Sequence, residues 1–458
     1  MGMGHAVVIL AAGLGTRMKS KLPKMLHPLL GKPMVAYAVE TALESGAERV
    51  VVVLGHGAEE VRQALKGYPL EYVVQERQLG TAHALLQARP LLEDYPGPIV
   101  LRQGDTPLAR AETIINLVKA LETSDLVLLT VKMADPTGMG RIIRDADGEI
   151  IANVEEKDAN LAQRAIKEVN AGVYAFRKEV WAALEQIDNR NAAGEYYLPD
   201  LIRIYRAMGK HVRGLESNDP GELLGVNTRS QLAQVEAILL TRLRQQWMDR
   251  GVRMIQPETI YLEPSVELAP DVTLWPGVIL RGATKIGEGC EIGAYSVLTD
   301  MELEPGVTLR PNVVAEKSLI KSGADAGPFA RFRPGVVLEE GVHVGNFVEM
   351  KATRMRRGAK AGHVAYLGDA DIGEDSNIGA GTITANYDGK QKHRTIVGRG
   401  VFIGSNTTLI APIKIADGAY VAGGSTLNQD VPEDALAIAR ERQRNIEGYV
   451  KRKRGQAQ

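Results

Sequence analysis

The chain has 458 residues, too many for one hydrophobic core, so two or three domains are expected. A hydrophobic content of 45%, a charged content of 24% and a net charge of −1 give no bulk reason to bind nucleic acid or a membrane surface. Cys290 is the single cysteine, and neither a signal-peptide pattern nor an apolar run of about 18 residues occurs, so we expect a cytoplasmic protein without disulfides or membrane insertion.

Short apolar runs alternate with helical patterns from Ala6 to about Gly225. The segment 33–45 has helical spacing, with a proline at its start and Gly46 just beyond its end. Alternation of this kind predicts a Rossmann-like, doubly wound, mostly parallel sheet whose ligands bind beyond the carboxyl ends of the strands. The same patterns predict strands at 7–10, 49–54, 72–74, 99–101 and 126–131 and further helices at 58–66 and 80–92.

A long helical pattern at 229–250 is the natural connection to a second half with a different period. Aliphatic residues there recur every six positions, which fits neither an α-helix nor a hairpin sheet and predicts a parallel β-helix of stacked coils. The spacing does not give its handedness. We expect register breaks at 317–333 and 354–360 to be extruded loops, and the basic tail 451–454 to be a disordered, solvated end. The cleanest run is Val397, Ile403, Leu409, Ile415, Val421 and Leu427.

The first candidate site is the glycine-rich segment 10–18, LAAGLGTRM, which directly follows a predicted strand. Its glycines let backbone N–H groups approach an anion, although the segment is neither a Walker A loop nor a GxGxxG motif. A tight strand–helix turn is the alternative, but such a turn does not need the cations Arg17 and Lys24. Asp105 follows another predicted strand and could hold Mg²⁺, whereas its ordinary alternative is a loop or helix-capping aspartate.

These residues resemble a known family. The segment LAAGLGTRM with LPK at 22–24 resembles the signature of sugar-phosphate nucleotidyltransferases. Over nearly the whole chain the resemblance is to the bacterial bifunctional N-acetylglucosamine-1-phosphate uridyltransferases/glucosamine-1-phosphate N-acetyltransferases. It implies a uridyltransferase domain at 1–228, a linker helix at 229–250 and a left-handed β-helix acetyltransferase domain at 251–458. Its homotrimers would use acetyl-CoA, glucosamine-1-phosphate, N-acetylglucosamine-1-phosphate, UTP and Mg²⁺.

The resemblance also assigns roles in uridyl transfer. Asp105 and Asn227 would hold Mg²⁺, and Arg17 and Lys24 would be catalytic cations that neutralise the triphosphate. The Gln75 amide, with a donor and an acceptor, would match the imide edge of uracil. Ala171 stands where the family has threonine, and this departure should affect sugar contacts more than chemistry. The residues expected to bind the substrates are Leu10, Ala11, Ala12, Gly13, Lys24, Gln75, Gly80, Thr81, Gln103, Gly104, Asp105, Gly140, Glu155, Asn170 and Asn227.

The second candidate site centres on His363. A lone histidine on a β-helix face is more often a surface or packed residue, but His363 stands among sugar-binding residue types that resemble the acetyltransferase half of the family. By that resemblance it would take a proton from the attacking amine, and Asn386 would donate to the developing oxyanion. Cys290 is expected to be a packed residue, and Gly423 replaces the usual alanine. The residues expected to bind substrates are Arg333, Lys351, Tyr366, Asn377, Ala380, Asn386, Tyr387, Ser405, Gly423 and Arg440.

Two alternatives use the same folds. A pyrophosphorylase with one activity and a structural or regulatory β-helix would not need His363, Lys351, Asn377 and Asn386 together. A non-catalytic assembly subunit would not need Lys24, Asp105 and Asn227 intact. The sequence therefore favours one chain with two activities: acetylation of glucosamine-1-phosphate, then conversion of the product and UTP to UDP-N-acetylglucosamine and pyrophosphate.

Overall fold

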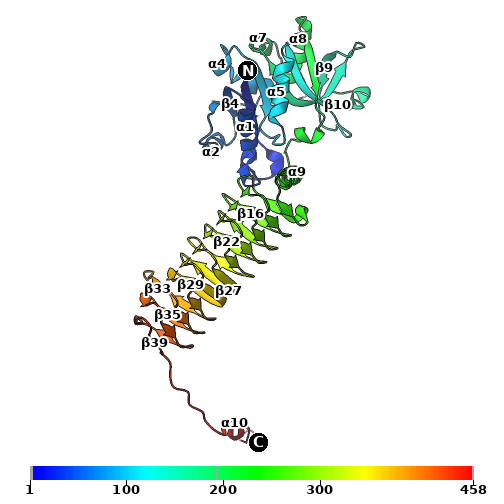
Figure 1. The fold of residues 1–458 in the computed structure, drawn as a ribbon. Helices are drawn as coiled ribbons and strands as arrows, with labels where there is room; N and C mark the ends of the chain where they lie inside the picture. The colour runs from blue at the N-terminus through cyan, green and yellow to red at the C-terminus, as the bar shows by residue number, and fades with distance from the viewer. Residues whose placement is uncertain (1–3, 192, 456–458) are drawn as a thin grey trace. The chain divides into compact units, whose positions relative to one another are not determined.

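The computed structural model describes residues 4–191 and 193–455 of the chain. They form two compact units that divide inside the long helix α9 (Arg229–Asp249), as Figure 1 shows. The first half of α9 packs Leu232 on the core of the first unit, and its second half packs Trp247 on the core of the second. The helix expected at 229–250 is thus present, and it contributes to both cores instead of being a free connector.

A nine-stranded sheet forms the centre of the first unit, in the order β11-β7-β10-β6-β1-β4-β5, with β8 attached to β10 and β9 to β8. Strands β6, β1, β4 and β5 pair in parallel, as the alternating pattern predicts, whereas β10 runs antiparallel to β6 and β7. The strands are β1 (Ala6–Ala11), β4 (Arg49–Leu54), β5 (Glu71–Val74), β6 (Ile99–Gln103), β7 (Leu126–Lys132), β8 (Arg141–Arg144), β9 (Ile150–Val154), β10 (Glu168–Phe176) and β11 (Val212–Glu216).

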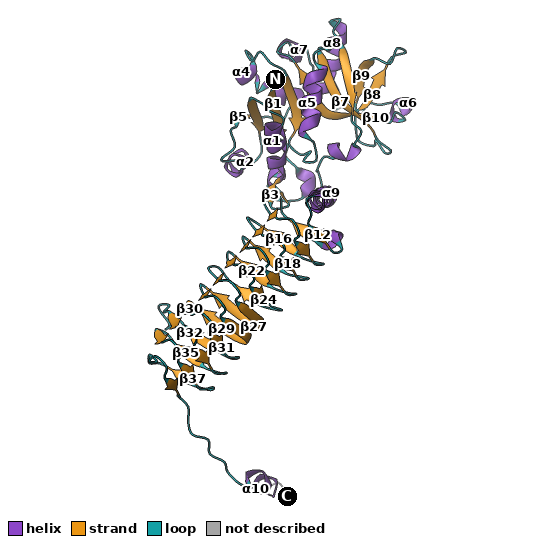
Figure 2. Cartoon of the chain, in the orientation of Figure 1, coloured by secondary structure: helices purple, strands orange, loops and turns teal. Residues whose placement is uncertain are grey.

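Helices cover both faces of this sheet (Figure 2). All six residues of β1 are buried, because alternate side chains enter two different cores. Val7 and Ile9 pack with α1 and α5, and Val8 and Leu10 pack with α3, α7 and α8. This two-sided burial leaves the carboxyl end of β1 at the edge where ligands of such sheets bind. The helices are α1 (Met34–Glu44), α2 (Ala58–Ala64), α3 (Thr81–Leu86), α4 (Arg89–Leu92), α5 (Ala111–Ala120), α6 (Leu161–Arg164), α7 (Val180–Leu184) and α8 (Leu201–Ala207).

The second unit is a parallel β-helix, as the six-residue period predicts. Leu262 pairs with Leu280 and Leu303 with Ile320, so successive coils are 18 or 17 residues long. The inward aliphatic residues of all coils form one continuous core. Three ladders of short strands run from β12 (Arg253–Met254) to β39 (Leu436–Ala437), from β13 (Tyr261–Leu262) to β38 (Thr426–Leu427) and from β14 (Glu267–Leu268) to β36 (Ile413–Ile415). Strands β27 (His343–Lys351) and β29 (Lys360–Gly368) extend over the first two ladders.

Two expectations about extruded loops were wrong. Segments 317–333 and 354–360 stay in the coils, because β23 (Leu319–Ile320) and β28 (Arg354–Met355) pair in register with their neighbours. A coil one residue shorter shifts the six-residue pattern without expelling a loop. The extruded loop is instead 386–394, in the coil where Ile372 pairs with Val397, 25 residues further on.

Two smaller differences have local causes. The helix expected at 80–92 is split into α3 and α4, because Pro90 lacks an N–H group and is accommodated in the first turn of a new helix. The basic tail expected to be disordered lies in a short exposed helix, α10 (Tyr449–Gly455). Within 4–191 and 193–455, no helix has the length and apolar character needed to cross a membrane.

Candidate active sites

The loop after β1 forms a close-packed cradle around Lys24. Gly15 has a φ of 65°, and a Cβ there would lie 2.5 Å from Cβ of Lys24, so glycine makes room for the lysine stem. Lys24 is only 7% exposed, which is rare for a lysine and requires partners for its charge. Arg17 lies exposed on the turn Thr16–Met18 and forms no ion pair with another described residue. The structure therefore places Lys24, and not Arg17, inside the cradle.

Lys24 Nζ donates to Oδ2 of Asp105 and, at 2.7 Å, to Oδ1 of Asn227. Two backbone hydrogen bonds hold these partners in place: Gly104 N donates to Leu10 O, and Val226 N donates to Asp105 O, both at 2.9 Å. A carboxylate oxygen and an amide oxygen thus converge on the ammonium group of Lys24 near the end of β6. Oxygen ligands of this kind fit Mg²⁺, which commonly takes one or two protein ligands and completes its shell with phosphates and water. Among the described residues, no group of three or more histidines, cysteines or carboxylates could hold a metal by itself.

A cavity of about 210 Å³ adjoins this point. Gln75 in its wall is 3% exposed, and its Nε2 lies 3.1 Å from Gly80 O and 2.9 Å from His83 Nδ1. Both N–H groups of the amide are thus engaged within the protein, so the expected donor for a base is not available and only the oxygen remains. The cavity is lined by Leu10, Ala12, Gly13, Lys24, Met25, Gln75, Gln78, Gly80, Thr81, Ala84, Gln103, Asp105 and Glu195.

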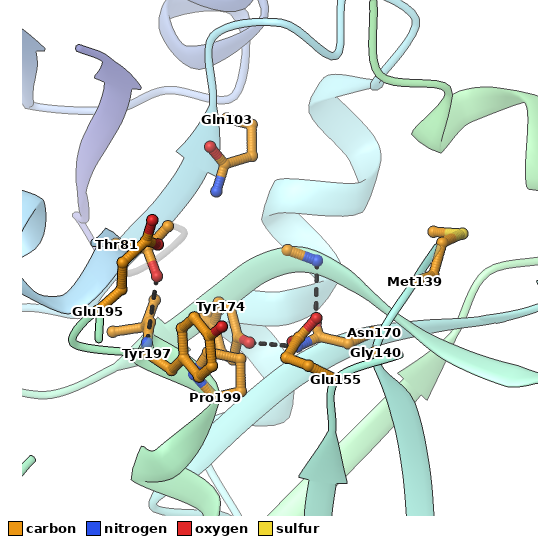
Figure 3. Close-up of a pocket in the computed structure, with 12 residues that line it drawn as sticks. Thr81, Gln103, Met139, Gly140, Glu155, Asn170, Tyr174, Glu195, Tyr197 and Pro199 are labelled. Atoms are coloured by element: carbon orange, nitrogen blue, oxygen red, sulfur yellow. Dashed lines mark hydrogen bonds between the residues drawn. The ribbon is translucent and has the colours of Figure 1, made fainter. Parts of the chain in front are cut away.

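A second cavity of about 280 Å³ shares Thr81, Gln103 and Glu195 with the first. Figure 3 shows Thr81 and Glu195 toward one end and Met139 and Glu155 toward the other. The two cavities therefore adjoin at shared side chains, so two ligands could meet there. The predicted residues Thr81, Gln103, Gly140, Glu155 and Asn170 line it with Met139, Gly172, Tyr174, Glu195, Tyr197, Leu198 and Pro199.

Hydrogen bonds within the protein hold the polar side chains that line this second cavity. Asn153 Nδ2 donates to Glu155 at 2.9 Å, and burial raises the pKa of Glu155 above its ordinary value of 4.5. A Cβ on Gly140 would lie 2.8 Å from Glu155 Oε1, which explains the glycine there. Asn170 donates to the hydroxyl of Tyr174 and accepts from Gly172 N at 2.9 Å. Ala171 is buried in the core beneath, where it carries no side-chain polar group toward the cavity.

In the β-helix, a row of five residues follows a corner of the coils, and all but Asn346 were predicted as site residues. Residues immediately after the row, such as Val364, Gly381 and Asn406, have positive φ and turn the chain. Backbone bonds from Gly381 N to Val364 O, from Asn406 N to Ala380 O and from Gly424 N to Ser405 O keep the coils aligned. Arg440 follows, with its side chain 3.8 Å from a Cβ built on Gly424. The row consists of Asn346, His363, Ala380, Ser405 and Gly423.

His363 is the residue of this row that is predicted to act as the catalytic base. It is exposed, and its Nδ1 lies 2.8 Å from Oδ1 of Asn346 on the neighbouring coil. An amide oxygen only accepts, so Nδ1 carries the proton and Nε2 is the free basic nitrogen. At Gly423, a Cβ would lie 3.2 Å from Ser405 O, so the glycine relieves a tight contact that alanine would make.

A second cluster lies around Gly368, at the other end of β29. A Cβ on Gly368 would lie 2.6 Å from the hydroxyl of Tyr366 and 2.7 Å from Nδ2 of Asn386, so both polar groups converge over the glycine. Lys351 pairs with Gly368, and Lys392 from the extruded loop lowers the pKa of Lys351, with a smaller contribution from Arg333. Arg333 is paired with Glu349 at 3.3 Å and Asp369 partly offsets the repulsion at Lys351, but Lys351 and Lys392 still repel each other, which favours an anion between them.

His363 and this cluster lie on opposite sides of a corner. His363 precedes Gly368 by five residues in β29, and the turn at Val364 lies between them. Asn377 pairs with Lys360, on the His363 side of the corner, whereas Tyr366 lies beyond it. Tyr387 is exposed on the extruded loop, where its hydroxyl donates to Gly389 O at 2.7 Å. The convergence of Arg333, Lys351 and His363 on one cleft stays a prediction.

Several residues of the two sites could not be predicted from the sequence. Lys392 belongs to the basic stretch KQKHR, whose return to the coils depends on the loop geometry. Asn346 has no signal beyond its place in a longer polar stretch, and Glu195 lies outside every motif. Cys290 is buried, as expected, and its thiol donates to Glu304 O, well away from both sites in sequence.

Comparison with known proteins gives matches for both units. Residues 7–202 match the family model of the MobA-like NTP transferase domain, and residues 394–429 match the hexapeptide repeat of succinyl-transferase. The chain is 60% identical over 456 residues to the bifunctional protein GlmU of Thermus thermophilus, covering 99% of this chain and 100% of that protein. It is 47% identical over 449 residues to the bifunctional protein GlmU of Brevibacillus brevis, covering 97% of each.

The full-length likeness agrees with the two sites just described, one beside a nucleotidyltransferase-type sheet and one along hexapeptide coils. The chain therefore belongs to the bifunctional GlmU family and has the uridyltransferase and acetyltransferase activities of UDP-N-acetylglucosamine synthesis.

Proposed function

We propose that the two activities belong to the two residue sets described above, with domain boundaries at 1–228, 229–250 and 251–458. The β-helix would acetylate glucosamine-1-phosphate, and the first domain would join the product to UTP. The observation that supports the first site is the convergence of Lys24, Asp105 and Asn227 beside two adjoining cavities.

In uridyl transfer, the phosphate oxygen of N-acetylglucosamine-1-phosphate attacks the α-phosphorus of UTP, and pyrophosphate leaves. The cavity with Gln75 would hold the base, and the cavity with Glu155 and Asn170 would hold the acetylated sugar. Lys24 supplies a positive charge in the wall of the cavity with Gln75, which attracts the triphosphate and stabilises charge on the leaving group. We propose that Asp105 and Asn227 hold Mg²⁺, which would neutralise phosphate charge when bound.

In acetyl transfer, His363 would take a proton from the amine of glucosamine-1-phosphate through Nε2. The amine nitrogen attacks the acetyl carbonyl carbon, the carbon–sulfur bond breaks, and the thiol of CoA leaves with a proton. Asn346 accepts a hydrogen bond from the Nδ1 proton, so Nε2 is the nitrogen of the neutral ring that carries the free lone pair. Arg333, Lys351 and Lys392 would bind the phosphate, while acetyl-CoA lies along Ala380, Ser405 and Gly423 toward Arg440.

We further propose that the acetyltransferase site forms between copies of the chain in a homotrimer. The base and the cation cluster lie on opposite sides of the corner at Val364 in one copy, and a second copy packed at this corner would complete the site. Phe329, Phe347 and Val364 also stand 50–57% exposed at the corner with positive φ, and the two phenylalanine rings stack at 5.4 Å. Exposed apolar side chains on a strained corner favour burial against another subunit. Since UTP and acetyl-CoA are made inside cells, we also propose a cytoplasmic location.

One assay tests the division of labour. The protein is supplied with glucosamine-1-phosphate, acetyl-CoA, UTP and Mg²⁺, and UDP-N-acetylglucosamine is measured together with free thiol and pyrophosphate. His363→Asn should stop thiol release, while uridyl transfer from added N-acetylglucosamine-1-phosphate continues; Lys24→Met should do the reverse. Loss of both activities in either folded variant would overturn the assignment. The mass of the purified protein in solution tests the trimer.

A further inference from the structure

The orientation of the Gln75 amide is determined by two neighbours in the fold. Gly80 O lies 3.1 Å and His83 Nδ1 lies 2.9 Å from its Nε2. A primary amide has two N–H groups, so these two contacts use both. No described residue donates to Oε1, and Gln75 lies in the wall of the cavity beside Lys24 and Asp105. The amide therefore presents an acceptor, and no donor, to a ligand in that cavity.

The Gly80 carbonyl only accepts, so it directs the Nε2 end of the amide toward itself, but it leaves the second N–H group without a partner. Its oxygen also accepts from Ala84 N at 3.1 Å, and Gly80 is held at a φ of 111°, where a Cβ would lie 2.5 Å from Tyr196 O. This anchored acceptor occupies one N–H of Gln75. The second N–H needs its own acceptor, because a buried donor without a partner is costly. His83 Nδ1, in α3, is that acceptor.

His83 is not named by any of the sequence motifs. Gln87 Nε2 donates to the backbone oxygen of His83 at 3.0 Å. Its 3.4 Å approach to the ring Nε2 is not a hydrogen bond when Nδ1 is the unprotonated nitrogen, because both groups are then donors. The ring also lines an apolar cavity with Leu79, Leu86 and Ile187, none of which offers it a hydrogen bond through a side chain. Because Gln75 Nε2 only donates, the His83 nitrogen facing it must be the unprotonated one.

Uracil and cytosine differ at the edge that such an acceptor reads. Uracil carries a hydrogen on N3, whereas cytosine has a lone pair there, which would face the lone pairs of the amide oxygen. A site with a fixed acceptor rejects the base that cannot donate. We propose that His83 is a positioning residue that fixes the Gln75 amide with its oxygen toward the base and so makes the uridyltransferase select UTP over CTP. This proposal rests on the proposed contact between Gln75 and the base.

A matched pair of substitutions tests the proposal in the full-length enzyme. His83→Asn places an amide oxygen where Nδ1 stood, and His83→Leu has nearly the same shape without an acceptor. The kcat and KM for UTP and for CTP are measured with N-acetylglucosamine-1-phosphate and Mg²⁺. We expect His83→Leu to lower the UTP/CTP ratio of kcat/KM by roughly tenfold or more, mainly through KM for UTP. His83→Asn should keep the ratio within about threefold of the parent enzyme.

Three controls distinguish a misfolded variant, a packing role of His83 and a wrong assignment of the base contact. Acetyl transfer by the same chain and thermal unfolding report whether each variant is folded. Equal losses in His83→Asn and His83→Leu would show a packing role and overturn the proposal, and so would an unchanged ratio in both. Gln75→Leu tests the underlying contact: a normal UTP/CTP ratio there would refute the base contact itself. A lowered ratio in Gln75→Leu with no effect in His83→Leu would refute only the role of His83.

Discussion

Asn346 and His363 occupy paired positions on adjacent coils, with Oδ1 of the asparagine 2.8 Å from Nδ1 of the histidine. This hydrogen bond decides which ring nitrogen is free to accept a proton. Asn346→Leu removes it with little change in volume, so the imidazole can rotate and change tautomer. We expect the kcat of acetyl transfer to fall by roughly tenfold to a hundredfold, measured as CoA thiol release. Uridyl transfer by the same variant is the control, and an unchanged kcat would contradict the positioning role of Asn346.

Separation of His363 from the cation cluster predicts complementation between subunits. His363→Asn and Lys351→Gln should each be nearly inactive in acetyl transfer when purified alone. A site shared between copies would re-form in mixed trimers, where an intact His363 from one chain meets an intact Lys351 from another. We therefore expect co-expressed variants to recover a readily measured fraction of parent activity. Activity in the mixture no higher than in either variant alone would place the whole site within one chain.

The Lys24–Asp105–Asn227 convergence predicts that uridyl transfer depends on the carboxylate of Asp105. Asp105→Asn keeps the shape and a side-chain oxygen near Lys24, but it removes the negative charge available to a divalent cation. Pyrophosphate release should fall by about a hundredfold or more and require more Mg²⁺, while acetyl transfer stays at the parent level. Asp94→Asn, at an exposed position after α4, is the matched control. Equal Mg²⁺ dependence in the Asp105 variant and the parent would contradict a metal role for Asp105.

Glu155 should make stability depend on pH in a defined direction. Its pKa is raised above 4.5 by burial, so the folded protein binds this proton more tightly than the unfolded chain does. The free energy of unfolding therefore falls as pH rises from 4.5 through the raised pKa, because ionised Glu155 is then held in a buried place. Glu155→Gln removes this cost, so its Tm should exceed the parent Tm at pH 7 and approach it near pH 4.

The measurement is thermal unfolding of both proteins across this pH range, with Glu44→Gln on the exposed end of α1 as the control. A Tm difference that does not change with pH would contradict the burial argument. In the uridyltransferase assay, the same substitution should raise KM for N-acetylglucosamine-1-phosphate by roughly 5-fold to 100-fold, because a carboxylate acceptor for the sugar is lost.

Lys351 should make phosphate binding sensitive to alkaline pH. Its neighbour Lys392 lowers the pKa of Lys351 below the ordinary 10.5, so Lys351 loses its charge at a lower pH than a solitary lysine would. KM for glucosamine-1-phosphate should rise as pH passes through the lowered pKa. Lys392→Gln should shift this rise to higher pH, whereas Lys390→Gln, at a neighbouring position on the same exposed loop, should not. The same pH profile in all three proteins would contradict the coupling of Lys351 and Lys392.

The sequence predicted those features that depend on local periodicity. Buried strands such as β1 and the six-residue rhythm at Val397 and Ile403 follow from side-chain alternation and coil stacking, which are repetitive and visible in the chain. Coil length was misread at 317–333, because one missing residue at a corner moves the pattern without changing the pairing. The extruded loop carrying Lys392 was missed because its closure depends on tertiary contacts.

Site residues within motifs were predictable, whereas their orientation was not. Gln75 was expected to offer a base one donor and one acceptor, and only the structure shows that Gly80 and His83 use its donors. His363 and Lys351 were expected in one cleft, and only the structure shows that a corner at Val364 lies between them in one copy. Such facts depend on neighbours that are distant along the chain, and no pattern of residue types records them.

The spacing of the coils between His363 and Gly423 sets the length of acyl donor that the second domain can bind. Each step from His363 to Ala380, Ser405 and Gly423 crosses one coil, and neighbouring coils are about 4.8 Å apart. A thioester carrier lying along these three steps would span about 14 Å before reaching Arg440. A long, flexible acyl donor could therefore contact both His363 and Arg440, whereas a short donor could not reach both.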